Sequence, residues 1–200
     1  MRRDTTTSLG RAAEVCRGGG VVLCPAETVY GLSGDARRPD VAARIHALKG
    51  SAPDKPILAL TDAWERVAPW VRHDDRLRRL WRRDDLGPLT LVLPATDAAP
   101  AALVGPDGTV GLRRTTSPTA RALVEALGAP LFSTSANRSG EPPPARLADV
   151  DAGIRRGVDA VLDAPTALAG RPSTVARYHA GEGRFEILRP GPVTADALEA

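Results

Sequence analysis

The sequence predicts an α/β fold in which helices pack on a twisted, mixed and open sheet. Short apolar runs typical of buried strands alternate with segments whose apolar residues recur at helical spacing. The order of these elements mixes strand–helix–strand crossovers with late hairpins. A chain of 200 residues with 42% hydrophobic residues can build one sizeable core. We therefore expect a single domain over residues 1–200, with its core at about 8–194.

In the first half of the chain, apolar stripes that end at Gly18 and Gly50 predict helices, and continuous apolar runs predict buried strands. In chain order, we expect a helix over residues 8–17, a strand over 20–25, a helix over 39–48, a strand over 56–60 and a helix over 72–83. The last of these holds six arginines, which suggests RNA binding. However, Leu77, Leu80 and Trp81 recur at helical spacing among acidic residues, so a solvated amphipathic helix is the favoured interpretation.

In the second half, Ser117 is a helix N-cap and Gly128 a helix stop, and the remaining apolar runs read as strands. In chain order, we expect strands over residues 90–93 and 109–113, a helix over 118–127, and strands over 130–133, 158–162, 173–178 and 185–188. A hairpin turn is expected at residues 179–183.

Composition excludes several classes of protein. The net charge of +3 permits an anionic ligand but is small for a dedicated nucleic-acid binder. P-loop, Rossmann and Gly-x-Ser-x-Gly signatures are absent, and the few His and Cys do not have zinc-ligand spacing. We expect Cys16 and Cys24 to be buried thiols. The apolar runs are too short for a membrane span and no signal-peptide core follows the start, so a soluble, cytoplasmic protein is expected.

Two lysines stand apart from the other basic residues. Of 27 Lys and Arg residues, only Lys49 and Lys55 are lysines, and both lie in one short stretch after the second helix. A compact ammonium group in this place predicts contact with a phosphate or carboxylate. The alternative is coincidence, together with the preference of a helix C-terminus for cations.

Two segments rich in hydroxyls and glycines, residues 25–32 and 133–140, each follow an apolar run and predict a site for a small polar ligand. Further polar residues occupy other predicted strand ends. Such distributed donors suit electrostatic and positional catalysis on a phosphate ester better than covalent catalysis. The candidate donors are Thr28, Lys49, Lys55, Thr109, Arg113, Ser133, Ser135, Asn137, Ser173, Thr174 and Arg189.

A series of short motifs extends this prediction. In order, they are Pro25-Ala26-Glu27-Thr28-Val29-Tyr30-Gly31-Leu32, Lys49-Gly50 with Lys55-Pro56-Ile57, Gly87-Pro88-Leu89-Thr90, Val110-Gly111-Leu112-Arg113, Thr134-Ser135-Ala136-Asn137-Arg138-Ser139-Gly140, Ser173-Thr174-Val175 and Leu188-Arg189-Pro190-Gly191. The series resembles that of the YrdC family, whose members make L-threonylcarbamoyladenylate. The resemblance covers residues 8–194, and because the chain stops soon after Gly191 it resembles the short, single-domain form.

The resemblance implies a reaction, its partners and a YrdC-like fold with a positively charged, concave cleft. The substrates ATP, L-threonine and bicarbonate would give threonylcarbamoyl-AMP and pyrophosphate. ATP is expected to bind together with Mg²⁺. A separate transferase would then move the threonylcarbamoyl group to an adenosine of tRNA, and contact with tRNA itself is a further expectation. No membrane partner and no metal ligand of the chain's own are expected.

The resemblance also assigns residues by position. Threonine would be held by Thr28, Arg113, Ser133 and Ser173. ATP would be bound by Lys49, Ser51, Lys55, Thr109, Ser135, Asn137 and Arg189, of which Lys49, Lys55 and Arg189 are the catalytic candidates. Arg113 suits the threonine carboxylate because a guanidinium binds a carboxylate through a bidentate fork.

The chain departs from the family pattern at two positions. Ala26 stands where the family typically has threonine, and Ser51 stands where a Lys-x-Arg pair would place arginine. We hypothesise that Lys55, rooted four residues later, supplies the missing cation. Two alternative functions remain: a paralogue of the same fold that binds RNA or nucleotide without making the adenylate, and a carbamoyltransferase module. The second would need an accessory domain for which no residues are left over.

Overall fold

The computed structural model describes residues 6–164 and 168–199. In chain order, its helices and strands are α1 (Leu9–Arg17), β1 (Val22–Pro25), β2 (Tyr30–Asp35), α2 (Pro39–Lys49), β3 (Leu58–Thr61), α3 (Asp75–Trp81), β4 (Leu89–Pro94), β5 (Thr109–Arg114), α4 (Pro118–Leu127), β6 (Leu131–Ser135), α5 (Ala152–Gly157), β7 (Ala160–Val161), β8 (Thr174–His179), β9 (Arg184–Arg189) and α6 (Ala195–Glu199). Short 3-10 turns cover Trp64–Arg66, Ala68–Trp70, Ala101–Leu103 and Leu147–Asp149.

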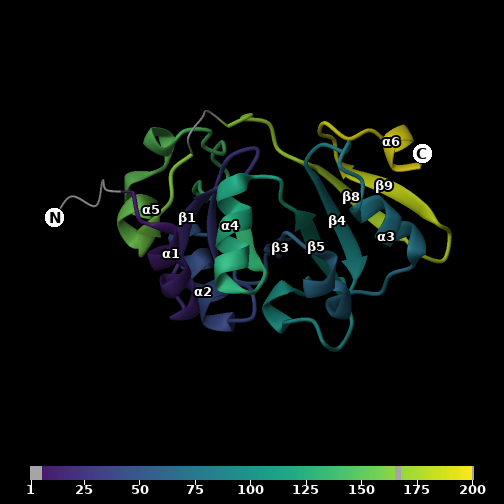
Figure 1. The fold of residues 1–200 in the computed structure, drawn as a ribbon, viewed down its shortest axis with the longest axis horizontal. Helices are drawn as coiled ribbons and strands as arrows, with labels where there is room; N and C mark the ends of the chain where they lie inside the picture. The colour runs from purple at the N-terminus through teal and green to yellow at the C-terminus, as the bar shows by residue number, and fades with distance from the viewer. Residues whose placement is uncertain (1–5, 165–167, 200) are drawn as a thin grey trace.

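The strands in the described residues form one sheet with the order β7-β1-β2-β6-β3-β5-β4-β8-β9. The pairs β1–β7, β3–β5 and β4–β8 are parallel, and the other neighbours are antiparallel. Helices α1 and α4 lie together over one half of this elongated molecule, and α3 and α6 lie at the other half beside β8 and β9 (Figure 1). The predicted fold class, a mixed sheet with packed helices, is confirmed.

The hydrophobic core has two parts because neighbouring strand residues point to opposite faces of the sheet. Val22 of β1 and Leu131 of β6 pack with α1 and α4, whereas the next residues, Leu23 and Phe132, belong to the larger cluster that includes α2 and α3. Both cysteines are free and buried, as expected. Burial raises the pKa of the Cys16 thiol to about 12, so this thiol stays protonated at neutral pH.

The structure differs from the sequence-based expectations in four elements. Strand β2 was expected as part of a ligand loop, because its two glycines and its lack of alternation conceal a strand that is buried on both faces. Helices α5 and α6 are too short for a helical period to appear in the sequence. The arginine-rich helix is shorter than expected: the side chain of Asp74 caps it by accepting a hydrogen bond from the Leu77 backbone N–H at 3.0 Å.

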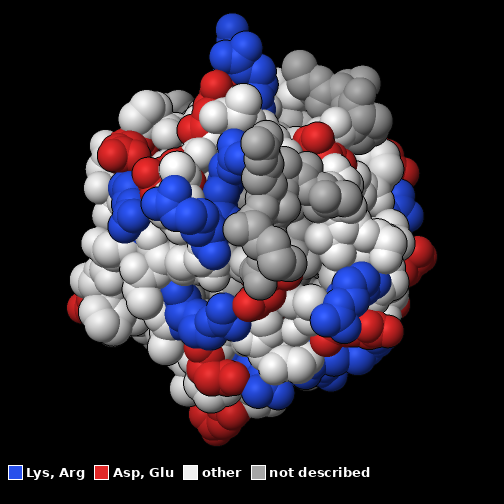
Figure 2. Space-filling view, turned by 90° about the vertical axis from the view of Figure 1, so that its left-hand side faces the viewer, with Lys and Arg blue, Asp and Glu red and all other residues white. Residues whose placement is uncertain are grey.

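On the face that Figure 2 shows, charges of both signs are mixed rather than segregated. The end of the molecule around α1 and α5 shows basic and acidic side chains close together (Figure 2). Ion pairs there include Arg11 with Glu14 and Arg138 with Asp151. The described residues of this face therefore form no continuous basic field of the kind that nucleic acid would need. In the described part of the chain, no helix combines the length and the apolar character required to cross a bilayer.

Candidate active site

A cleft of about 410 Å³ opens over the sheet between β2 and β9. Side chains that can hydrogen-bond line much of it: Thr28, Thr90, Asp107, Thr109, Arg113, Ser133, Ser135, Ser173, Arg177 and Arg189. Apolar side chains from the neighbouring strands and loops share the lining, among them Ile57, Leu58, Val92, Val175 and Leu188. A cleft that combines apolar walls with convergent polar groups is the usual form of a small-molecule site.

Strand register places Arg113 and Arg189 at the two ends of one row of residues that runs across the sheet. Thr90 of β4 pairs with Arg113 of β5 and with Val175 of β8, and Val175 pairs with Arg189 of β9. All four residues line the cleft. Two guanidiniums therefore flank one row of the sheet, with the Thr90 hydroxyl between them.

Arg113 is a buried cation with spare hydrogen-bonding capacity. Its side chain donates from Nη2 to the Thr28 hydroxyl at 3.2 Å and lies 3.3 Å from Oε2 of Glu27. The residue is only 6% exposed, and its Nε has no hydrogen-bond partner in the described residues. Burial lowers the pKa of Arg113, against the opposing effect of Glu27. A buried guanidinium with an unpaired N–H donor can bind an anion.

Glu27 holds this arginine to the loop between β5 and α4. Its Oε1 accepts hydrogen bonds from the Thr115 hydroxyl and from the backbone N–H groups of Thr116 and Ser117. Burial alone would raise the pKa of Glu27, but the Arg113 charge and these hydrogen bonds outweigh burial and lower it. The carboxylate is therefore ionised at neutral pH. The sequence analysis did not assign Glu27 to the site, although it lies inside the first quoted motif.

Arg189 is oriented by a second network. Its Nε and Nη2 donate to the backbone carbonyl of Ser173 at 3.2 and 2.9 Å, and Nη2 also lies 3.2 Å from the Ser173 hydroxyl. That hydroxyl is 3.0 Å from the Thr90 hydroxyl. Burial lowers the pKa of Arg189, and no carboxylate in the described residues pairs with it. Thr90 was quoted in a motif but was not expected at the site.

A third group lies at the other end of β5. Asp107 accepts from the Thr109 hydroxyl at 2.7 Å and from Arg177 at 2.5 Å. Neither Asp107 nor Arg177 was expected at the site, because each is an ordinary surface residue type with no motif around it. Strand register, in which Arg177 pairs with Val92, identifies Arg177, and the ion pair with Arg177 identifies Asp107.

Lys49 does not line the cleft. Its Nζ donates to the backbone carbonyls of Ser135 and Asn137, the latter at 2.9 Å, and its own carbonyl accepts from the Ser139 N–H at 3.0 Å. Burial, together with the nearby Lys55 charge, lowers the pKa of Lys49 to about 8. In this structure Lys49 fastens the end of α2 to the loop after β6.

The other nucleotide candidates outside the cleft lie near Lys49. The Asn137 side chain donates to the carbonyls of Arg138 and Glu141, and its buried Oδ1 has no partner in the described residues. The Ser51 hydroxyl lies 2.8 Å from Nδ1 of His46. Lys55 is exposed and directly precedes Pro56, which lines the cleft.

Of the eleven residues that the resemblance assigned to threonine and ATP, seven lie at the cleft and four lie beside it. Those at the cleft are Thr28, Thr109, Arg113, Ser133, Ser135, Ser173 and Arg189; those beside it are Lys49, Ser51, Lys55 and Asn137. In the described ranges, no group of three or more His, Cys, Asp or Glu side chains comes together as a metal-ligand set.

Comparison with known proteins identifies the family. Residues 14–191 match the Sua5/YciO/YrdC family model, which is described as "Telomere recombination". The chain belongs to the Sua5/YciO/YrdC family. The resemblance to YrdC proteins found in the sequence is therefore confirmed.

Members of this family with curated names include the threonylcarbamoyl-AMP synthase of Xanthomonas axonopodis pv. citri, which is 34% identical over 88% of this chain and 96% of its own length. The threonylcarbamoyl-AMP synthase of Coxiella burnetii (strain RSA 493) is 32% identical over 90% of this chain and 97% of its own.

Solved structures of Sua5/YciO/YrdC proteins show the same fold. P. abyssi Sua5 complexed with L-threonine superimposes with a TM-score of 0.86 at 30% identity, covering 96% of this chain and 56% of the Sua5 chain. E. coli YciO superimposes with a TM-score of 0.83 at 23% identity, covering 95% of this chain and 92% of the YciO chain. At 23% identity, the YciO match is evidence for the fold alone.

Proposed function

We propose that this protein is a threonylcarbamoyl-AMP synthase, which makes L-threonylcarbamoyladenylate and pyrophosphate from ATP, L-threonine and bicarbonate. The observation that carries the proposal is the buried Arg113 with an unpaired Nε, set among the Thr28, Ser133 and Ser173 hydroxyls in a cleft that also holds Arg189. The names of the curated relatives support it, as does the threonine bound by P. abyssi Sua5.

In this proposal Arg113 holds the threonine carboxylate, and its buried position makes the pairing strong because little water competes. Thr28, Ser133 and Ser173 offer hydroxyls to the remaining polar groups of threonine. The threonine nitrogen forms a bond to the carbon of bicarbonate, and water leaves to give a carbamate. A carbamate oxygen then attacks the α-phosphorus of ATP, and the bond from the α-phosphorus to the bridging oxygen breaks to release pyrophosphate.

The residues of the chain contribute position and charge to these steps rather than a covalent intermediate. Arg189, with no carboxylate partner in the described residues, is placed to neutralise phosphate charge. Lys55 would reach the phosphates from the loop beside Pro56, in place of the arginine that Ser51 replaces. ATP is expected as its magnesium complex, so that the metal arrives with the substrate. Thr109, Ser135, Asn137 and Lys49 would complete the nucleotide site.

The product implies further partners. A mixed anhydride of a carbamate and AMP is a reactive acylating agent, and a threonylcarbamoyl transferase acting on tRNA would consume it. That reaction places the protein in the cytoplasm, where tRNA is modified. Direct contact with tRNA would be weak and salt-dependent on a surface with mixed charges.

The test is to incubate the purified protein with MgATP, bicarbonate and threonine, and to measure threonine-dependent pyrophosphate release together with threonylcarbamoyl-AMP by mass spectrometry. Arg113→Met should abolish both signals while ATP still binds. Arg146→Met is the matched control, because Arg146 is exposed and pairs with Asp149.

The alternative is a paralogue that binds nucleotide without making the adenylate. The replacement of arginine by Ser51, whose hydroxyl contacts His46, favours this alternative. ATP binding with no threonine-dependent turnover would establish it and exclude the synthase.

A further inference from the structure

Positively and negatively charged residues occupy different parts of the cleft, and the proposed substrates do not by themselves explain this distribution. Three arginines line it, and Asp107 is the one carboxylate among the described residues of the lining. Arg113 and Arg189 flank the row of β-strand residues described above, whereas Asp107 precedes the start of β5. The anion-binding end and the acidic end are therefore different places in the same cleft.

Strand geometry separates these two ends. Thr109, Gly111 and Arg113 line the cleft from alternate positions of β5, so they share one face of the strand. At a rise of about 3.3 Å per residue, Thr109 and Arg113 are about 13 Å apart along the strand. The Asp107 carboxylate accepts a hydrogen bond from the Thr109 hydroxyl, so it lies at the Thr109 end of this row, and Asp107 also borders a neighbouring hollow formed by the β8–β9 turn. Because Arg113 holds threonine in the proposed function, a nucleotide whose phosphates lie at Arg189 would extend its other part toward Asp107.

The hydrogen-bond partners of Asp107 fix the orientation of its carboxylate but do not use all of its acceptor sites. Thr109 donates to Oδ1 and Arg177 donates to Oδ2, while the side chain remains 45% exposed. An ionised carboxylate has about four lone-pair sites, so further acceptor sites face the open cleft. Because the Thr109 hydroxyl is committed to Asp107 as a donor, Thr109 too presents lone pairs to a ligand. This end of the cleft therefore offers hydrogen-bond acceptors, while Arg177 offsets the charge of the carboxylate.

We propose that Asp107 accepts a hydrogen bond from a ribose hydroxyl of the bound nucleotide and makes the site selective for ribonucleotides over deoxyribonucleotides. The inference rests on the proposed function, in which the nucleotide is ATP. Ribose hydroxyls are the donors that a nucleotide presents between its phosphates and its base. Arg177 is a positioning residue in this scheme, because its ion pair holds the carboxylate in one orientation. The hydrogen bonds of Thr109 and the Arg177 charge also lower the pKa of Asp107, which keeps it ionised.

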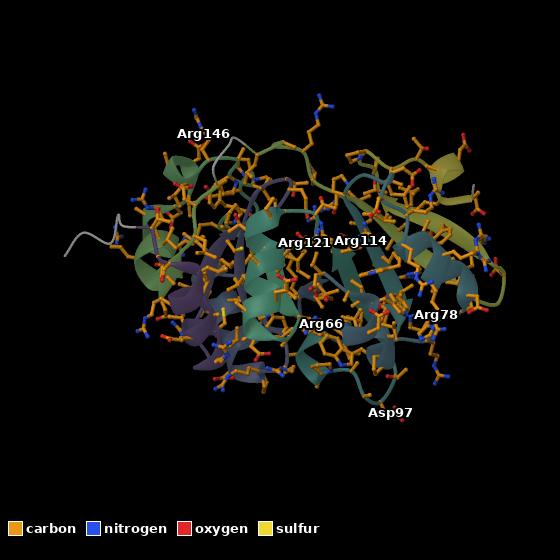
Figure 3. All side chains as sticks on the ribbon, viewed as in Figure 1. Arg66, Arg78, Asp97, Arg114, Arg121 and Arg146 are labelled. Carbon is orange, nitrogen blue, oxygen red and sulfur yellow. The ribbon has the colours of Figure 1, made fainter. Side chains whose placement is uncertain are left out.

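The experiment measures binding of MgATP, 2′-deoxy-ATP and 3′-deoxy-ATP by calorimetry, and so does not depend on turnover. The wild type should bind at least one deoxy analogue about ten- to a hundredfold more weakly than ATP, the range expected for a hydrogen bond to a charged group. In Asp107→Asn, the affinity for ATP should fall toward that for the analogue, and the ratio should shrink to less than about threefold. Asp97→Asn is the matched control, because Asp97 points away from the sheet at the outside of the molecule (Figure 3) and should leave the ratio unchanged.

Each outcome bears on the proposal separately from the synthase activity. Equal binding of ATP and both analogues by the wild type would overturn it, whether or not Asp107→Asn folds. An unchanged ratio in a folded Asp107→Asn would overturn it as well, as would the absence of any nucleotide binding. A protein that discriminates through Asp107 but forms no threonylcarbamoyl-AMP would retain this inference and reject the synthase.

Discussion

Glu27 and Arg113 form an ion pair with a separation of 3.3 Å, and their side chains are 13% and 8% exposed. Because water is largely excluded, each charge depends on the other, and removing one partner leaves a buried charge without compensation. The Ser117 backbone N–H donates to Glu27, so the pair also joins the loop between β1 and β2 to the start of α4. It is thus the point at which stability and substrate binding are coupled.

Glu27→Gln should lower the free energy of unfolding by about 3 kcal/mol, the cost of breaking a buried ion pair. Chemical denaturation at pH 7 measures the change. Glu14→Gln on the exposed face of α1, where its partner Arg11 is also exposed, should change the stability by less than about 0.5 kcal/mol. A Glu27→Gln protein as stable as the wild type would show that Arg113 does not need this counter-ion.

The same pair predicts a dependence on pH. Burial, which would raise the pKa of Glu27, is outweighed by the Arg113 charge and the hydrogen bonds, so the folded pKa lies below the ordinary value. The stability from Glu27 is therefore complete above its unfolded pKa of about 4.3 and is lost as the pH falls below it. Denaturation of the wild type and Glu27→Gln between pH 7 and pH 3 should show their difference shrinking with acid. A difference that stays constant to pH 3 contradicts the ionised pair.

Lys49 should titrate far from an ordinary lysine. Burial and the nearby Lys55 charge lower its pKa to about 8, so folding disfavours its charged form and the contribution of Lys49 to stability rises with pH above about 8. Because the chain has only two lysines, a ¹³C-lysine NMR titration can follow each one. One signal should have a midpoint near pH 8 and should disappear in Lys49→Arg. A spectrum in which no lysine titrates below pH 10 contradicts the buried amine.

The sequence predicted the strands that carry obvious apolar runs, and it predicted the site mainly through its motifs. It missed β2 because two glycines and burial on both faces leave no alternation in Tyr30–Asp35. It missed Thr90, Asp107 and Arg177 for a different reason. Which side chains face the cleft depends on the register between β5, β4 and β8, which are far apart in the chain, and no local pattern encodes that register.

Lys49 and Asn137 illustrate the opposite case. Their motifs correctly placed them near one another, yet in the structure each bonds to loop backbone rather than facing the cleft. Residue type and spacing indicate proximity, but the direction of a side chain depends on which carbonyls lie within reach. Their roles toward nucleotide therefore remain predictions.

Thr90→Val should raise the KM for threonine about tenfold with a smaller change in kcat. The Thr90 hydroxyl can donate to Ser173, which then directs its own proton to the substrate; valine keeps the shape and removes that donor. Steady-state kinetics would measure the split, and Thr90→Ser should restore the KM. Thr96→Val, whose hydroxyl instead donates to the Pro69 carbonyl, is the control. If Thr90→Ser behaves like Thr90→Val, packing rather than the hydroxyl explains the effect.

Gly191→Ala should destabilise the protein by about 1–3 kcal/mol, because overpacking forces the backbone to move. A Cβ at this position would lie 2.3 Å from the backbone nitrogen of Thr174 and 2.7 Å from the carbonyl carbon of Ser173. The displaced segment holds Ser173, so threonine should also bind more weakly. Gly10→Ala in α1 meets nothing within 4 Å and should be neutral or slightly stabilising. Thermal unfolding of both variants checks this, and a Gly191→Ala protein with an unchanged Tm would show that the close contact relaxes freely.

Ser51→Arg should raise kcat if Ser51 marks the loss of a phosphate-binding arginine that Lys55 only partly replaces. The loop of residues 51–56 is largely exposed, so a guanidinium fits without repacking the core, and only the Ser51 contact with His46 is lost. A gain of roughly tenfold corresponds to about 1.4 kcal/mol of transition-state stabilisation. It should appear in kcat rather than KM if the added charge pairs better with the phosphorus of the transition state than with bound ATP. Lys55→Ala should abolish ATP binding in the wild type but only weaken it in Ser51→Arg, since the two cations would then share one phosphate. A fall in kcat in Ser51→Arg, from a wild type that is already fully active, would instead show that the loop has been rebuilt around Lys55.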